Sequence, residues 1–304
     1  MDTMRYKNID NHVTNKKSIG DMYRWRKERS KKKKDVSYNV PQSEEKQIAY
    51  LQSNKKDTTI TWIGHSTFLV QLDGCTILTD PVWAYRMGFD KRLTNPGLAI
   101  SDLPEIDVVV ISHGHYDHLD FPTLKKLPHG ITYFVPVGLK KLFNKKGFTN
   151  VEEFTWWEEQ TYRGVTFSFV PAQHWTRRTM LDMNTSHWGG WMFQGTETIY
   201  FGGDSGYFHG FKEIGERFDI DIALMPIGAY EPEWFMRDSH MAPEEAVQAY
   251  LDIQAKHFIP MHYGAFRLAD DTTAEALERL HEAWEKYELP KEQLTCLSLG
   301  ETYK

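Results

Sequence analysis

The chain of 304 residues has 36 Lys or Arg against 42 Asp or Glu, a formal net charge of −6, and 14% aromatic residues, enough for a large core. Its two cysteines, without CxxC spacing, argue against a disulfide scaffold. No segment approaches the ~18 apolar residues of a membrane span, and the first residues lack the apolar centre of a signal peptide. We therefore expect a soluble, cytoplasmic protein.

Charge is distributed unevenly. Residues 1–40 hold twelve Lys or Arg and five Asp or Glu, and the extreme segment is YRWRKERSKKKKD. This composition predicts a basic, solvated and partly flexible N-terminal extension over residues 1–56. The alternative is a peripheral contact with an anionic membrane, since each basic residue near such a surface contributes ~1 kcal/mol. The acidic remainder argues against nucleic-acid binding, and nothing indicates an oligomeric state.

From residue 57 onward, short segments rich in β-branched and aromatic residues alternate with Gly, Pro and Asp, a pattern typical of strands and turns. No repeat of 20–50 residues is present. Strands interleaved with helices predict one α/β domain with two sheets over residues 57–304. The predicted strands, with their flanking residues, are 58–64, 66–74, 75–81, 107–112, 131–136, 163–173, 188–195, 197–204, 221–228 and 257–261.

Two helices are predicted near the C-terminus. The segment 242–256 has Pro243 close to its start and two glutamates in its first turn, where carboxylates favour the helix dipole. The segment 272–289 opens with Thr272 three residues before Glu275, which is the spacing of a capping box.

The segment DVVVISHGHYDHLD, residues 107–120, places histidines and aspartates directly after an apolar strand. A polar turn with solvent-facing histidines does not explain four candidate ligands within six residues. Strands of one sheet end along a common edge, so groups after different strands can meet there. Imidazole and carboxylate groups suit divalent metals, Zn²⁺ foremost, and seven are too many for one tetrahedral ion. The candidate ligands of two ions with a bridging carboxylate are His113, His115, Asp117, His118, His174, Asp204 and His262.

The segment HGHYDH resembles the HxHxDH signature of the metallo-β-lactamase superfamily, and the later histidines and aspartate follow that family's order. The resemblance implies an αββα metallo-β-lactamase sandwich with a dinuclear metal site at the sheet edge. It also implies which residues would hold each ion: His113, His115 and His174 the first, Asp117, His118 and His262 the second, with Asp204 bridging them.

A narrower resemblance covers roughly residues 57 to 268. The segments TWIGHSTFLV, AQHWTRRTMLDMN, FGGDSGY, PIGAYEPEWFM and HMAPEEAV are similar to the N-acylphosphatidylethanolamine-hydrolysing phospholipase D branch. The resemblance implies a zinc-dependent phosphodiesterase that uses a metal-activated water on such lipids or related phosphodiesters. Its substrate partner would be a phospholipid or another phosphodiester, and its catalytic residues would include Asp117 and Asp204.

The same resemblance singles out two residues outside the ligand set. His240, just before a predicted helix, aligns with a histidine that contacts substrate, and we expect it to contact the phosphate or the leaving group as a third catalytic residue. The alternative is a helix-capping or surface histidine. Tyr116, inside HGHYDH, aligns with a substrate-contacting tyrosine. Its alternative role is packing beneath the loop.

Several nearby residues have two interpretations each. His65 and Asp80 orient metal ligands through hydrogen bonds, or they stabilise turns. Arg177 and Arg178 bind the phosphodiester, or they form a structural ion pair with Asp182. Four tryptophans line an apolar acyl channel, or they fill the core: Trp175, Trp188, Trp191 and Trp234.

Three other functions compete with the phosphodiesterase. A metal-dependent lactonase acting on a sugar-acid lactone would use the same metals. An electron-transfer di-iron protein on this fold would have a carboxylate in place of His115 and an added flavin domain, and neither is present. A metal-free binding module does not fit a complete ligand set. A serine hydrolase is also disfavoured, because Ser66 lacks the GxSxG turn.

Overall fold

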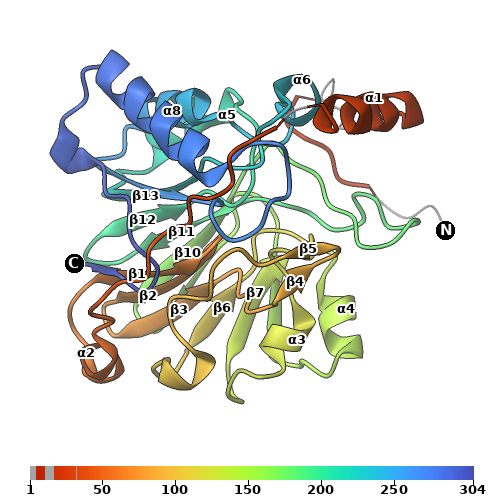
Figure 1. Ribbon diagram of the computed structural model, residues 1–304. Helices are drawn as coiled ribbons and strands as arrows, with labels where there is room; N and C mark the ends of the chain where they lie inside the picture. The colour runs from red at the N-terminus through yellow and green to blue at the C-terminus, as the bar shows by residue number, and fades with distance from the viewer. Residues whose placement is uncertain (1–4, 11–16, 32) are drawn as a thin grey trace.

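Two β-sheets pack face to face, and helices cover the outer face of each sheet (Figure 1). This computed structural model describes residues 5–10, 17–31 and 33–304. The four layers are those of the αββα sandwich, so the predicted fold class is confirmed.

The first sheet has seven strands, antiparallel at its beginning and parallel from β3 to β8. Leu51, Leu124 and Phe143 pack on its outer face from α2 (Ile48–Ser53), α3 (Phe121–Leu124) and α4 (Lys140–Lys145). In spatial order the strands are β15 (Thr302–Tyr303), β1 (Thr59–Gly64), β2 (Thr67–Leu72), β3 (Cys75–Thr79), β6 (Val108–Val110), β7 (Thr132–Pro136) and β8 (Val151–Phe154).

The second sheet has six strands, and three longer helices lie over it (Figure 1). These helices are α5 (Gly210–Arg217), α7 (Pro243–Asp252) and α8 (Thr273–Lys286). In spatial order the strands are β14 (His257–Met261), β13 (Ile222–Pro226), β12 (Thr198–Phe201), β11 (Gly190–Gln194), β10 (Val165–Val170) and β9 (Glu159–Tyr162). Smaller elements are the hairpin of β4 (Arg86–Met87) and β5 (Asp90–Lys91), helix α6 (Glu233–Met236), and 3₁₀ turns at Ile100–Asp102 and Lys291–Gln293.

Burial is continuous along β1, β2 and β3 because both faces of the sheet are covered. Successive side chains of a strand point to opposite faces. Phe68 and Val70 of β2 therefore enter the core between the sheets, whereas Leu69 faces the helical layer. Trp62 and Trp191 are fully buried in the same central core. These large aromatic side chains thus fill part of the space between the sheets.

Strands that run in one direction deliver their following residues to one edge of the sandwich. In the first sheet, β1 and β3 are both antiparallel to β2, and β6 is parallel to β3. In the second sheet, β10 and β12 are both antiparallel to β11, and β14 is parallel to β12 through β13. The site described below is formed by residues that follow β1, β3, β6, β10, β12 and β14.

The predicted helices are present. Helix α7 begins at Pro243, and the Glu245 carboxylate accepts a hydrogen bond from the Ala242 backbone N–H. Helix α8 follows Thr272, whose hydroxyl accepts from the Glu275 backbone N–H at 3.2 Å. No helix in the described part of the chain has both the length and the apolar composition of a membrane span.

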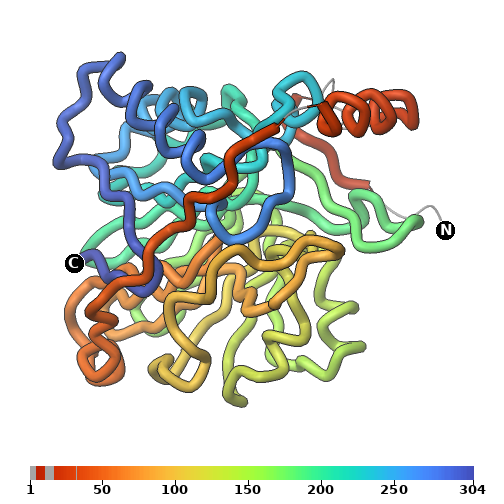
Figure 2. Tube along the Cα trace, viewed as in Figure 1, coloured from red at the N-terminus to blue at the C-terminus, as the bar shows by residue number. Residues whose placement is uncertain are grey.

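The described part of the N-terminal extension packs against the body. Helix α1 (Ile19–Arg29) lies beside α6, and the chain then passes from the upper to the lower helical layer before α2 (Figure 2). Lys17, Arg29 and Lys34 form ion pairs with acidic groups beyond residue 200, which balances part of the uneven charge. Residues 1–4, 11–16 and 32 lie outside the described residues, and the boundary at residue 57 stays a prediction.

Candidate metal centre

The structure brings together all seven residues that the sequence predicts as metal ligands. Ligand atoms of His113, His115 and His174 lie within 4.8 Å of one another and form the first cluster. A second cluster includes His65 in addition to predicted ligands, and its ligand atoms also lie within 4.8 Å of one another. The second cluster comprises His65, Asp117, His118 and His262.

In the first cluster, three imidazole nitrogens converge. His115 Nδ1 lies 2.9 Å from His113 Nε2 and 3.1 Å from His174 Nε2. On the outer side, the Nδ1 atoms of His113 and His174 each lie 2.9 Å from an oxygen, Ser112 Oγ and the Ser239 carbonyl respectively. If each Nδ1 donates its proton to that oxygen, both Nε2 lone pairs point inward, as metal ligation requires.

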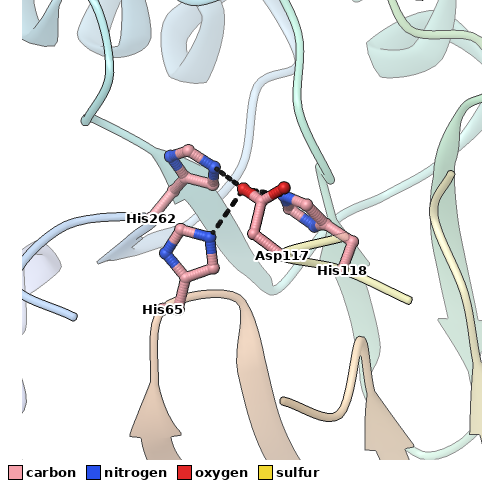
Figure 3. A group of neighbouring side chains, drawn as sticks. All are labelled: His65, Asp117, His118 and His262. Atoms are coloured by element: carbon pink, nitrogen blue, oxygen red, sulfur yellow. Dashed lines mark hydrogen bonds and ion pairs between the residues drawn. The ribbon is translucent and has the colours of Figure 1, made fainter. Parts of the chain in front are cut away.

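In the second cluster, three imidazoles surround the Asp117 carboxylate (Figure 3). Asp117 Oδ2 lies 3.4 Å from His118 Nε2 and 3.6 Å from His262 Nε2. The same oxygen lies 3.2 Å from His65 Nε2. His65 therefore forms a hydrogen bond of the kind predicted for it, one that orients a ligand carboxylate.

Asp204 lies between the two clusters and is 3% exposed. Its Oδ1 is 3.0 Å from His262 Nε2, and its Oδ2 is 3.2 Å from His118 Nε2. Oδ2 also faces the first cluster, at 3.9 Å from His113 Nε2 and 3.8 Å from His174 Nε2. A carboxylate that bridges two ions requires such a central position.

Asp80 is fully buried and forms hydrogen bonds that connect the two clusters. Its Oδ2 contacts His118 Nδ1 at 2.7 Å and accepts from the Ser112 hydroxyl at 2.5 Å, while Oδ1 accepts from the Ser112 backbone N–H at 2.7 Å. Because the Ser112 hydroxyl also contacts His113, one carboxylate orients a ligand in each cluster. These hydrogen bonds are compatible with both interpretations of Asp80, and its role toward metal ligands stays a prediction. Sequence reasoning missed Ser112, whose only signal is its place directly before His113.

The backbone around the site adopts unusual conformations. His65, Asp80 and His262 have φ angles of 56°, 33° and 63°, in a region that residues other than glycine rarely adopt. Gly203 has φ 60°, and a Cβ there would lie 2.8 Å from Ser112 Cβ, so Asp204 is carried by a turn that requires glycine. Such strained positions cluster at functional sites.

His118 and His262 of the second cluster and the Asp204 carboxylate shift one another's pKa values toward the charged forms. Burial alone would raise the pKa of Asp204, but His118 and His262 bring it well below its ordinary value. Burial alone would lower the pKa of His262, but Asp204 and Asp117 raise it to about 9. The pKa of His118 is raised well above its ordinary value by the same two carboxylates. His118 and His262 therefore hold protons beside the carboxylates that would attract a metal cation.

The first cluster is uncharged. Burial, followed by the neighbouring imidazoles, lowers the pKa of His113 well below its ordinary value, and burial is also the main cause that lowers the pKa of His115 to about 4. His118 Nε2, His262 Nε2 and Asp204 Oδ1 are buried, and the close contacts of both histidines with Asp204 lack the geometry of hydrogen bonds. Such atoms normally have a partner, and a bound cation would supply it. The residues thus fit divalent metal ions.

A cavity of about 300 Å³ opens onto both clusters. His240 lines it, with Nδ1 3.8 Å from Asp204 Oδ2 and a side chain only 15% exposed. The N-cap of α7 is Ala242, so the helix-capping and surface alternatives for His240 are wrong. Burial lowers the pKa of His240 to about 4, which leaves the imidazole neutral at pH 7. The apolar walls of the cavity are Trp175, Ala229, Phe235, Met236 and Leu268.

Tyr116 is 53% exposed, so the packing alternative for it is wrong. It lines a second, open hollow of about 550 Å³ that also reaches His115 and Asp117. Its hydroxyl donates to the Arg178 carbonyl at 3.0 Å, and the Arg178 guanidinium lies 4.0 Å from its ring centroid. Its contact with substrate stays a prediction.

Arg178 holds a loop of the site, and the contact of the two arginines with a phosphodiester stays a prediction. Arg178 donates to the carbonyls of Gly114, at 2.8 Å, and Leu119, at 3.0 Å, and so holds the loop that carries the ligands. Asp182 accepts from the backbone N–H groups of Arg178 and Thr179. Arg177 is exposed and does not line the metal-site cavity.

The four tryptophans do not form one channel. Trp188 and Trp191 are buried, and their indole N–H groups donate to backbone carbonyls. Trp234 donates to Glu28 of α1. Trp175 is the one of the four that lines the metal-site cavity. Most of these side chains therefore fill the core or hold the extension.

An αββα sandwich with clustered His and Asp at its edge is the architecture of the metallo-β-lactamase fold. The family model described as the β-lactamase superfamily domain matches residues 75–263, more than half of the chain. The chain belongs to this superfamily, and relatives in it are named as hydrolases.

Two curated relatives are similar over most of the chain. The N-acyl-phosphatidylethanolamine-hydrolyzing phospholipase D 1 of Caenorhabditis elegans is 40% identical over 226 residues, 68% of this chain and 64% of that protein. The mitochondrial N-acyl-phosphatidylethanolamine-hydrolyzing phospholipase D of Saccharomyces cerevisiae is 32% identical over 262 residues, 80% of this chain and 55% of that protein. The chain thus matches less than two thirds of the length of each relative.

A solved structure shares the fold. Igni18, a metallo hydrolase from Ignicoccus hospitalis, superimposes with a TM-score of 0.64 at 23% identity, covering 81% of this chain and 98% of that protein.

Metal-free protein is expected to bind two equivalents of Zn²⁺ at pH 7 and to release protons as it does so. His118 and His262 have raised pKa values without metal, and a histidine must lose its proton to bind a metal ion, so affinity should rise as the pH increases toward about 9. Calorimetric titration in two buffers of different ionisation enthalpy measures both quantities. Saturation at one equivalent would argue against a dinuclear site, and the absence of proton release would contradict the charge assignment.

Proposed function

We propose that the chain is a zinc-dependent phosphodiesterase of the phospholipase D type, with its hydrolase domain at residues 57–304. It hydrolyses N-acylphosphatidylethanolamine-like lipids or related phosphodiesters. The position of Asp204 between two metal-ligand clusters, at the wall of a cavity, carries the proposal. The names of the nematode and yeast relatives support the class of substrate.

Two zinc ions per chain complete the site, although other divalent metals suit the same nitrogen and oxygen donors. When bound, such ions lower the pKa of a water molecule toward neutrality and neutralise charge on phosphoryl oxygens. The proposed ligands are His113, His115 and His174 for one ion, Asp117, His118 and His262 for the other, and Asp204 for both.

The remaining groups orient these ligands and the substrate. Asp80 keeps the His118 ring in position, and His65 does the same for the Asp117 carboxylate. His240, neutral and directed into the cavity, donates an N–H to the phosphoryl group. Tyr116 contacts the substrate from the adjoining hollow. No protein nucleophile is required.

A lipid substrate fits the surroundings of the site. The cavity combines ligand carboxylates with apolar walls, which suits a phosphate that carries an acyl-bearing group. Helix α1 exposes Arg26 and Lys27 together with Ile19 and Tyr23, a composition suited to an anionic lipid surface. The proposed location is therefore the cytoplasm, peripheral to a membrane.

A substrate panel on zinc-reconstituted protein tests the proposal. Bis-p-nitrophenyl phosphate and N-acylphosphatidylethanolamine in mixed micelles should both be cleaved, with phosphatidic acid as the lipid product. A sugar-acid lactone should remain closed under the same conditions. Chelated protein is the control and should be inactive on each substrate.

The outcomes separate the functions. Lactone opening without diester cleavage would replace the proposed function by the lactonase. Cleavage of the small diester alone would keep the phosphodiesterase and remove the lipid. Activity that survives complete removal of metal would contradict the metal-dependent chemistry.

A further inference from the structure

We infer that Lys17, in the N-terminal extension, binds the anionic phosphate group of the substrate inside the metal-site cavity; this inference rests on the proposed function. Lys17 lines the cavity together with His115, Asp117, Asp204 and His240. It is the one Lys or Arg among the described residues that do so. Lys17 also lies outside residues 75–263, where the superfamily domain is matched.

The extension is held at the site from two sides. Asn8 Oδ1 accepts from the backbone N–H of the ligand His174 and from Trp188 Nε1, at 3.0 Å each. Trp25 of α1 stacks on Phe235, a wall of the cavity, with ring centroids 5.0 Å apart. These contacts place Lys17 in a segment that is part of the active site and not a detached arm.

Lys17 is poised to exchange its partner. Its Nζ lies 3.3 Å from Asp238 Oδ2 and 5.3 Å from the Phe235 ring centroid. The side chains of Lys17 and Asp238 are 23% and 43% exposed, so solvent screens their attraction and the pair is weak. A phosphate that enters the cavity can therefore take the place of the Asp238 carboxylate.

The size of the cavity brings a bound phosphate close to this ammonium group. A volume of about 300 Å³ lies at the small end of ligand sites, so a substrate that reaches the metal ligands also reaches the Lys17 wall. A lysine ammonium acts as a point charge for phosphate oxygens. A neutral lactone gains nothing from that charge, so Lys17 favours anionic diesters.

Four zinc-loaded variants test this assignment by inorganic phosphate binding and by KM for bis-p-nitrophenyl phosphate. Lys17→Gln should weaken both roughly tenfold with a small change in kcat, because one charged contact is lost. Lys17→Arg should restore most of the loss. Asp238→Asn, which frees the ammonium, should strengthen both about twofold. Lys31→Gln removes the same charge from an exposed site in the same segment and should change neither.

Phosphate binding decides the inference independently of turnover. Equal phosphate affinity in wild type, Lys17→Gln and Asp238→Asn would overturn it, whether or not the enzyme cleaves diesters. An equal loss in Lys17→Gln and Lys31→Gln would also overturn it, because general charge would then be the cause. Absence of diester cleavage by the wild type, with the predicted order of phosphate affinities, would instead contradict the proposed function and retain the anion site.

Discussion

Asp204→Asn is expected to lower kcat by a factor on the order of 10³ or more without unfolding the protein. Loss of a group that merely orients a metal ligand already costs ~10–100-fold, and Asp204 lies between both ligand clusters. A neutral amide bridges two cations poorly, and its NH₂ group would face His118 or His262. Turnover of bis-p-nitrophenyl phosphate measures the loss of kcat, and the melting temperature shows whether the fold is retained. Metal content shows whether the ions stay bound.

Asp219→Asn is the matched control for this change. Asp219 is an exposed carboxylate that shares Lys256 with Asp221, so its loss leaves the lysine with a partner. The control should retain full activity and both metals. Near-normal kcat in Asp204→Asn with two ions still bound would remove Asp204 from the mechanism. Loss of one ion alone would make it a ligand of that ion and not a bridge.

Strands in the interior of the sheets could be predicted because burial on both faces requires an apolar sequence. Val108–Val110 and Ile222–Pro226 are examples, and each is followed by residues of the site. The edge strands Glu159–Tyr162 and Thr302–Tyr303 were missed. The first alternates exposed and half-buried residues, and the second has only two, so neither contains a distinct apolar pattern.

The ligands could be predicted because each directly follows a strand, and strands of the same direction end at one edge. Hydrogen-bond partners contributed by the backbone could not be predicted. The Ser239 carbonyl faces His174, and the carbonyls of Gly114 and Leu119 fix Arg178, but any residue type can offer a carbonyl. Such partners become visible only when the chain is folded.

The extension shows a different limit of sequence reasoning. A run of basic residues with few apolar ones predicts a solvated arm. The structure places Trp25 on the Asp270 carboxylate, and Lys34 between Glu231 and Glu275. The acidic partners are more than 190 residues away in sequence, so only the tertiary structure reveals that the extension complements the acidic body.

His240→Ala is expected to lower kcat by roughly 10²–10³-fold while both metal ions remain bound, the usual effect of losing one preorganised donor. His240 belongs to neither proposed ligand trio. Its Nδ1 has no hydrogen-bond partner among the described residues and lies 3.8 Å from Asp204 Oδ2. Turnover and metal content should therefore change independently, which a loss of ligation would not allow.

Two substrates distinguish what His240 does. Because burial lowers its pKa to about 4, the imidazole is neutral at pH 7 and is a poor proton donor to a leaving alkoxide. A neutral N–H can still stabilise charge on a phosphoryl oxygen. We therefore expect the same loss for an alkyl diester and for a p-nitrophenyl diester. A loss that shrinks for p-nitrophenolate, which departs without a proton, would identify His240 as the general acid instead.

Rescue and pH dependence complete the test. His240→Gln keeps an N–H donor near the same position and should recover part of the loss, whereas His129→Ala, a change at an exposed histidine, should have no effect. The neutral imidazole is the active form, so the contribution of His240 should be constant above pH ~5 and decline as the pH falls through about 4. A contribution that instead declines between pH 6 and 8 would mean that the protonated ring acts. Loss of a metal ion in His240→Ala would place this residue among the ligands.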